Sequence, residues 1–157
     1  MDLAAIKEDG RLMAGRSPVV SAAFEADQPI GDARRLAASF LADLQTVHGL
    51  MVSEEAAGQV QLVVSELASN ARKYAPGPYL LALEARDGAV EVSVWDSESA
   101  LPVIAQPDPR RIGRHGLEVV TALCRSFEMH REPVGKRVKA AVALGPDWGT
   151  GVGRHIG

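Results

Sequence analysis

The chain has 157 residues, a hydrophobic fraction of 46% and a formal net charge of −3 at pH 7. This length fits one domain with a single core, and the acidic balance gives no support for a nucleic-acid surface. The lone cysteine, Cys124, excludes an internal disulfide and makes a cytoplasmic location the default expectation. No apolar run is long enough for a transmembrane helix. Charged residues interrupt residues 1–15, so we expect no signal peptide.

The first part of the chain predicts an arm, a strand and a helix. Residues 1–16 are weakly patterned and predict a mobile arm. Residues 17–26 alternate apolar side chains and carry a proline near their start, which predicts an edge strand. Apolar residues recur at helical spacing over Asp32–Val47, with Asp32 as a candidate N-cap.

The next segment predicts a helix that could carry a functional site. Ser53 followed by acidic residues is a typical helix start, and the apolar residues of 59–75 recur at helical spacing. Glu66 and Asn70 are four residues apart, so they share one side of this helix, which Lys73 continues. An Asn amide oxygen is a hard ligand for magnesium, and a Glu carboxylate can orient or deprotonate a nucleophile. Taken alone, this pair is also typical of a solvated helix face.

Two hairpins flank a long irregular segment in the second half. Tyr79–Arg86 and Ala89–Trp95 alternate on either side of Asp87-Gly88, a typical two-residue hairpin turn. Residues 97–112 contain three prolines and no regular pattern, which is typical of a functional or disordered loop. The remaining predicted elements are a helix over 117–125, strands over 126–131 and 136–144, and a flexible tail over 145–157.

Side chains that suit a nucleotide follow the first hairpin. Asp96 ends its second strand, where a carboxylate can accept a hydrogen bond from an exocyclic amine; an ordinary strand-end acid is the alternative. Gly113 and Gly116 allow close backbone approach, and the first N–H groups of the following helix can bind a phosphate. Arg111 and Arg114 bring positive charge to the same turn.

The order of these segments resembles the histidine kinase-like ATPase superfamily, whose ATP-binding domain occurs in histidine kinases and gyrase-type topoisomerases. Residues 66–70 (ELASN) resemble its N box, and Asp96 resembles its adenine-reading aspartate. Gly113–Leu117 resembles its second glycine box. The closest resemblance is to small stand-alone anti-sigma-factor serine kinases and related regulatory ATP-binding proteins of actinobacteria. It covers roughly Val19–Leu144, nearly the whole chain.

The resemblance implies a Bergerat-type ATP-binding fold over residues 17–144. This is a two-layer α/β sandwich in which a mixed, mostly antiparallel sheet carries three helices on one face. The implied ligands are ATP or ADP with Mg²⁺, with Glu66 as the general base and Asn70 as the magnesium ligand. The nucleotide-binding residues that it implies are Asn70, Lys73, Asp96, Arg111, Gly113, Arg114, His115, Gly116 and Leu117.

The resemblance also implies a function in transcription regulation. A serine/threonine kinase of this type phosphorylates or sequesters a protein partner, here a sigma factor or an anti-anti-sigma protein of the STAS type. We expect it in the cytoplasm, without direct nucleic-acid or membrane binding, and with its first strand available for homodimerisation. Arg34 and Arg35 would then approach the terminal phosphate, or else be solvated surface charges.

Two departures from the family pattern keep other readings open. The family motif has a glycine two residues after its aspartate, where this chain has Glu98. A threonine often follows the glycine that begins the last strand, but here Gly135 is followed by Lys136, so that contact is either replaced or lost. These departures favour a non-catalytic ATP-binding partner-switch module as the alternative function. An ATPase without a protein substrate is a further alternative.

Overall fold

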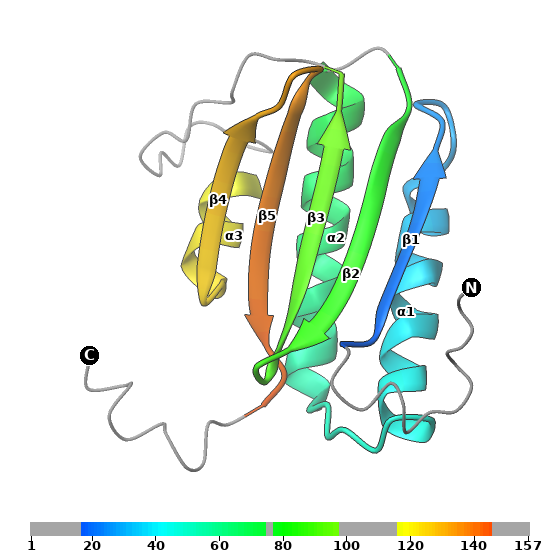
Figure 1. The fold of residues 1–157 in the computed structure, drawn as a ribbon, viewed down its shortest axis with the longest axis vertical. Helices are drawn as coiled ribbons and strands as arrows, with labels where there is room; N and C mark the ends of the chain where they lie inside the picture. The colour runs from blue at the N-terminus through cyan, green and yellow to red at the C-terminus, as the bar shows by residue number, and fades with distance from the viewer. Residues whose placement is uncertain (1–16, 75–76, 98–115, 146–157) are drawn as a thin grey trace.

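The computed structural model describes residues 17–74, 77–97 and 116–145. In these residues, five strands form one sheet and three helices cover one face of it (Figure 1). The strands are β1 (Val19–Phe24), β2 (Tyr79–Arg86), β3 (Ala89–Asp96), β4 (Ser126–Arg131) and β5 (Lys136–Ala143). The helices are α1 (Ile30–Thr46), α2 (Glu54–Tyr74) and α3 (Gly116–Leu123). The predicted two-layer α/β sandwich is confirmed.

The strand order in the sheet is β1-β2-β3-β5-β4. Each pair of neighbours in this order is antiparallel, so the sheet is antiparallel throughout where we expected some mixed character. Both predicted hairpins pair as expected, and β1 lies at an edge, where the proline before it is tolerated. The hairpins meet along β3 and β5, which places β3 at the centre of the sheet.

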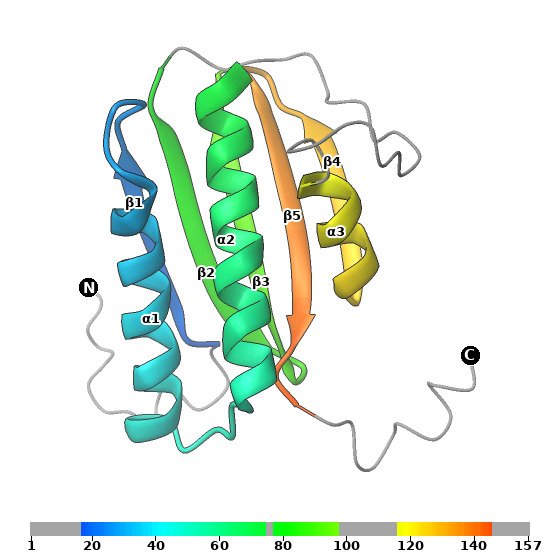
Figure 2. The same cartoon turned by 180° about the vertical axis from the view of Figure 1, so that it is seen from behind.

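The core lies between the sheet and the helices. Side chains along a strand point alternately to opposite faces, and in β3 the row Val90, Val92 and Val94 faces the helices with at most 1% exposure. Helix α2 packs across the middle of the sheet, between α1 and α3, and lies in front of the sheet in Figure 2. Aromatic side chains are few, so Val, Leu and Ala fill most of this core.

The helix starts follow local chemistry. Ser53 caps α2 as predicted, because its Oγ accepts a hydrogen bond from the Ala56 N–H at 3.0 Å. The predicted N-cap at Asp32 is wrong. Helix α1 begins at Ile30, directly after the extended Pro29, so Asp32 lies inside the first turn. Among the residues described here, no helix combines the length and apolar character needed to cross a membrane.

Candidate functional site

Helix α2 presents different side chains to its two neighbouring helices. Toward α1, Arg34 donates a hydrogen bond to Ser65 Oγ at 3.3 Å, and Gln61 Nε2 donates to the Arg34 carbonyl at 3.0 Å. Successive residues of a helix are rotated by about 100°, so Glu66 and Asn70, four residues apart, share a side of α2 that differs from the side of Gln61 and Ser65. Helices α1 and α3 flank α2 on its two sides (Figure 2). Glu66 and Asn70 are both half-buried. The pair predicted from its spacing therefore shares one side of a helix, as expected.

Asp96 ends β3 at the same end of the molecule as the C-terminus of α2 (Figures 1 and 2). It continues the helix-facing row of Val92 and Val94 and is 7% exposed. Directly opposite in register, Lys136 begins β5 and continues the helix-facing row of that strand. The Lys136 ammonium donates to both carboxylate oxygens of Asp96, at 3.0 Å and 2.9 Å. The residue predicted to read adenine is therefore half of a buried ion pair.

The energetics of this pair decide how a ligand could use Asp96. The side chains of Lys136 and Asp96 are 1% and 2% exposed, so both charges are desolvated. Removing one partner of such a pair costs roughly 3–5 kcal/mol, because the other charge stays buried without compensation. A hydrogen bond to a charged group contributes roughly 1.5–3 kcal/mol. Asp96 is consequently not a lone carboxylate, because its charge is compensated within the fold by Lys136.

Gly135 allows Lys136 to reach this position. Its φ of +83° lies in the left-handed region that glycine adopts without strain. A Cβ added there would also lie 2.7 Å from the Asp96 carbonyl carbon and 2.9 Å from Ser97 Cα. The family pattern has threonine after this glycine, and here a lysine bonded to Asp96 takes its place.

Sequence reasoning missed the partnership of Lys136 with Asp96, although a signal was available. Lys136 is in phase with Val138, Ala140 and Val142, the row of β5 that faces the helices. A lysine is almost never fully buried unless it is paired, so its place in an apolar row indicates a buried acid opposite.

The structure describes only some of the other predicted site residues. Lys73 is exposed near the end of α2. Helix α3 begins at Gly116, and the half-buried Leu117 packs against the core. Four predicted site residues lie outside the described ranges, together with most of the predicted lid: Arg111, Gly113, Arg114 and His115.

The two arginines of the first turn of α1 contact neighbouring side chains. Arg34 bonds to Ser65, on the side of α2 that contacts α1. Arg35 forms an i,i+3 ion pair with Asp32. In this structure each arginine contacts a neighbouring side chain, and its approach to a terminal phosphate stays a prediction.

The residues present fit a magnesium ion held mainly through phosphates. Within the described part of the chain, no three His, Cys, Asp or Glu side chains gather into a metal site. Mg²⁺ does not need such a cage, because it keeps several waters and takes one or two protein oxygens besides substrate phosphates. Asn70 and Glu66 provide an amide oxygen and a carboxylate on one side of α2, which matches this sparse requirement.

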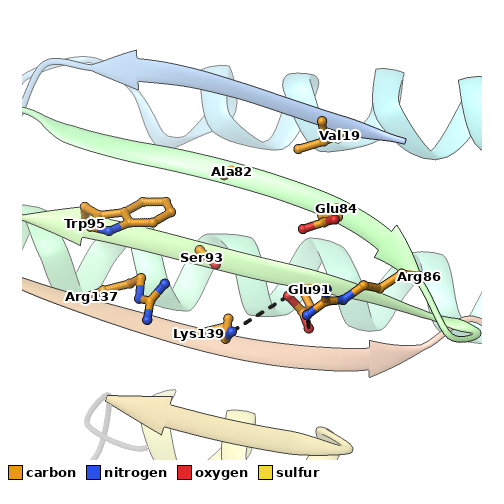
Figure 3. Close-up of a pocket in the computed structure, with 9 residues that line it drawn as sticks. All are labelled: Val19, Ala82, Glu84, Arg86, Glu91, Ser93, Trp95, Arg137 and Lys139. Atoms are coloured by element: carbon orange, nitrogen blue, oxygen red, sulfur yellow. Dashed lines mark hydrogen bonds and ion pairs between the residues drawn. The ribbon is translucent and has the colours of Figure 1, made fainter. Parts of the chain in front are cut away.

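A shallow depression of about 250 Å³ lies on the sheet face that no helix covers (Figure 3). The Arg137 guanidinium lies over the Trp95 ring here, 5.7 Å from its centroid. Residues 95 and 137 alternate with Asp96 and Lys136 along their strands, so they point away from the helices. The depression is therefore separate from the predicted nucleotide site.

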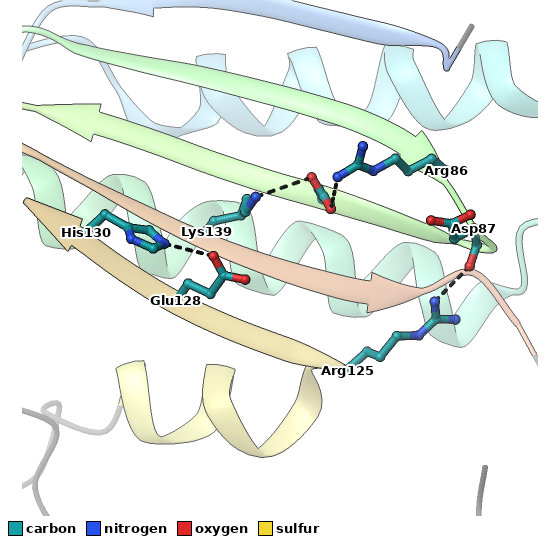
Figure 4. Close-up of polar contacts among 7 residues, drawn as sticks. Arg86, Asp87, Arg125, Glu128, His130 and Lys139 are labelled. Atoms are coloured by element: carbon teal, nitrogen blue, oxygen red, sulfur yellow. Dashed lines mark hydrogen bonds and ion pairs between the residues drawn. The ribbon is translucent and has the colours of Figure 1, made fainter. Parts of the chain in front are cut away.

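Charges on this open face are largely paired, either across strands or along β4 (Figure 4). The Glu91 carboxylate forms ion pairs with Arg86 at 3.1 Å and with Lys139 at 3.9 Å. His130 and Glu128 are 2.8 Å apart, and this hydrogen bond lowers the pKa of the Glu128 carboxyl. Such mutual pairing gives the face little net charge with which to attract a nucleotide.

The fold, with an acid and an amide on the central helix and a carboxylate at the end of the central strand, is that of a nucleotide-binding ATPase domain. A family model described as a histidine kinase-like ATPase domain matches residues 30–142, which is most of the chain. The chain therefore belongs to the histidine kinase-like ATPase family, and this membership supports ATP binding in a regulatory role.

Two further comparisons add little to this assignment. A search of curated proteins found no match. Among solved structures, the chain is similar to the histidine kinase domain of the blue-light activated histidine kinase from Erythrobacter litoralis EL346. The identity is 19%, the match covers 77% of this chain and 64% of that chain, and the TM-score is 0.43. The chain thus spans less than two thirds of the length of that relative.

Proposed function

We propose that the protein is a regulatory ATP-binding protein of the anti-sigma-factor serine kinase type. It binds Mg-ATP through residues 17–144 and phosphorylates or sequesters a protein partner. The single observation that carries this proposal is the half-burial of both Glu66 and Asn70, which share one side of α2. A half-buried carboxylate and amide four residues apart can serve a nucleotide better than a fully solvated pair.

Phosphoryl transfer needs mainly positioning and charge stabilisation, so a modest set of residues suffices. Glu66 takes the proton of a partner serine hydroxyl as that oxygen bonds to the terminal phosphorus of ATP and ADP leaves. Bound magnesium neutralises charge on the phosphates, and Asn70 offers it an amide oxygen. The turn Gly113–Leu117, with Arg111 and Arg114, supplies N–H groups and positive charge to the phosphates.

The proposed partner is a sigma factor or an anti-anti-sigma protein of the STAS type. The protein would act in the cytoplasm, and β1, an edge strand, offers a surface through which two copies could pair. These assignments follow the resemblance of the sequence to regulatory members of the family.

A non-catalytic partner-switch module is the second candidate function. The observation that favours it is the Asp96–Lys136 ion pair, which alters the carboxylate that the family uses for adenine. In this alternative the domain binds ATP and a partner, and no phosphate moves between them.

Calorimetry and phosphate incorporation together test the proposal. We expect Mg-ATP and ADP to bind, and radiolabelled ATP to label a serine of an anti-anti-sigma domain incubated with the protein. Binding of ATP without incorporation into any such domain would favour the partner-switch module. ATP consumption without labelling of a protein would identify a simple ATPase, and an absence of heat at millimolar nucleotide would contradict a working site.

A further inference from the structure

The connection between α1 and α2 exposes three apolar side chains close together in the chain. Val47 is 70% exposed, Leu50 38% and Met51 86%. The other exposed large apolar residues of the described ranges come singly from separate elements. Single exposed apolar side chains are normal on a protein surface, whereas a group of them indicates a surface that binds something. We call Val47, Leu50 and Met51 the loop patch.

Backbone hydrogen bonds hold the chain that carries the loop patch. The Val47 N–H donates to the Asp43 carbonyl at 2.8 Å, and the Leu50 N–H donates to the Leu44 carbonyl at 2.9 Å. Between them, Gly49 has a φ of +68°, the left-handed conformation that commonly ends a helix. The patch is therefore part of an ordered helix end and can be covered without rearrangement of the backbone.

The C-terminal segment begins beside this connection. The Ser53 N–H donates to the Leu144 carbonyl at 3.0 Å, which ties the end of β5 to the start of α2. The α1–α2 connection and the end of β5 lie at the end of the molecule opposite Asp96 (Figures 1 and 2). Residues 146–157 follow directly and lie outside the described ranges. Their first large apolar side chain is Trp148.

Chain length allows Trp148 to reach the loop patch. Trp148 is four residues beyond Leu144, a span of at most roughly 14 Å when extended. Met51 is two residues before Ser53, so it lies at most roughly 7 Å along the chain from the hydrogen bond that joins the two segments. The tryptophan can therefore cover Met51 without straining the chain between them.

The size of the loop patch favours a tethered occupant over a separate protein. A stable interface between two proteins takes roughly 20–30 residues a side, and the patch has three. A segment of the same chain has an effective concentration on the order of millimolar and loses little translational freedom when it docks. A small apolar contact with one aromatic side chain is then sufficient.

We propose that Trp148 docks on the loop patch and holds the C-terminal segment against the connection between α1 and α2. This contact covers apolar surface that the rest of the described chain leaves exposed. It lies at the end of the fold away from the predicted nucleotide site, so it is independent of nucleotide binding.

Tryptophan fluorescence tests this contact directly. The chain has two tryptophans, so Trp95→Phe leaves Trp148 as the only one. We expect the folded variant to emit at shorter wavelength than the same protein in urea, and iodide to quench it less. Adding Met51→Gln should shift the emission toward that of the unfolded chain and increase quenching. Val134→Gln is the matched control, because Val134 is also largely exposed but precedes the opposite end of β5.

The difference spectrum between wild type and Trp148→Phe isolates the same signal if Trp95→Phe does not fold. Equal emission and quenching of Trp148 in folded and unfolded protein would overturn the proposal. So would a shift that Met51→Gln leaves unchanged, because Trp148 would then be covered elsewhere. Docking within one chain is independent of protein concentration. A shift that appears only as the concentration rises would instead identify a second copy as the occupant and overturn the proposal.

Discussion

The backbone of Gly135 packs directly against the carbonyl of Asp96, with no space for a side chain between them. The two residues come from different hairpins, and their contact fixes where β5 begins relative to the end of β3. Lys136 is set opposite Asp96 in the β3–β5 register, so the close approach of one glycine helps to place the ammonium beside the carboxylate.

Gly135→Ala should therefore destabilise the protein strongly. The left-handed φ alone costs an L-residue roughly 1–2 kcal/mol, and the overlap with the Asp96 backbone adds to this cost. Gly88→Ala is a matched control, because its φ of +74° is similar but its nearest neighbour is an Arg125 side-chain nitrogen at 3.7 Å. Urea unfolding of both variants measures the difference. Equal losses of stability would contradict the importance of the Gly135–Asp96 contact.

Glu66→Gln should separate binding from chemistry. If Glu66 is the general base, phosphate incorporation into the partner should fall by roughly 10²–10⁴-fold with little change in ATP affinity. Glu55→Gln, an exposed residue of the same helix, should change neither quantity. Equal phosphate incorporation by wild type and Glu66→Gln would show that Glu66 is not the general base. If Glu66 is only a solvated helix residue, the substitution should change the free energy of unfolding by only a few tenths of a kcal/mol.

Asn70→Ala should weaken magnesium-dependent binding and transfer together, because the amide oxygen is a ligand in both steps. The diagnostic measurement is ATP affinity with magnesium and with EDTA. Magnesium should strengthen ATP binding much less in this variant than in wild-type protein. Ser69→Ala, exposed on the neighbouring position of α2, is the control and should preserve it. A full magnesium effect in Asn70→Ala would rule out this ligand.

Tyr79→Phe should stabilise the protein or leave it unchanged. Tyr79 is 2% exposed and stacks on Phe24 with ring centroids 5.6 Å apart, while its hydroxyl has no hydrogen-bond partner among the residues that the structure describes. Leaving a buried polar group unsatisfied costs roughly 1–3 kcal/mol, so removing the hydroxyl removes that cost and keeps the stacking. A loss of more than about 1 kcal/mol in urea unfolding would show that the hydroxyl contributes a favourable contact.

The same residue predicts a dependence of stability on pH. Burial, with a smaller contribution from Asp32, raises the pKa of the Tyr79 hydroxyl, against an opposing effect of Arg72. The folded state therefore holds this proton more tightly than the unfolded state, and the stabilisation is complete below pH of about 10, the unfolded pKa. It is lost as pH rises through the higher folded pKa. The free energy of unfolding, measured with urea at pH 8 and at pH 10.5, should fall less between these pH values in Tyr79→Phe than in wild type.

Local patterns predicted the fold well because each element carries its own signal. The Asp87-Gly88 turn predicted the first hairpin, and Ser53 predicted the start of α2, since both act through nearest neighbours. The prediction for the start of α1 was wrong because Asp32 suits both the N-cap and the first turn of a helix. The helix begins at Ile30, directly after the extended Pro29, and Asp32 lies in its first turn.

The site could be predicted only where its residues are close in sequence. Glu66 and Asn70 are related by helical spacing, which the sequence displays directly. Asp96 and Lys136 are 40 residues apart. The apolar row of β5 indicates that Lys136 has a buried acidic partner, but which acid it is depends on the β3–β5 register. The buried ion pair consequently emerged only from the three-dimensional arrangement.

The junction between β3 and β5 also bears on the order in which the protein folds. A hairpin forms in about 1–10 μs, but strands distant in sequence pair only after the entropy of closing the intervening loop has been overcome. Asp96 and Lys136 lie on separate hairpins, so their ion pair can appear only once both hairpins have docked. An intermediate with both hairpins formed but undocked would have strand content but would lack the Asp96–Lys136 pair at the predicted adenine site. Nucleotide affinity would then report late assembly, which circular dichroism alone would miss.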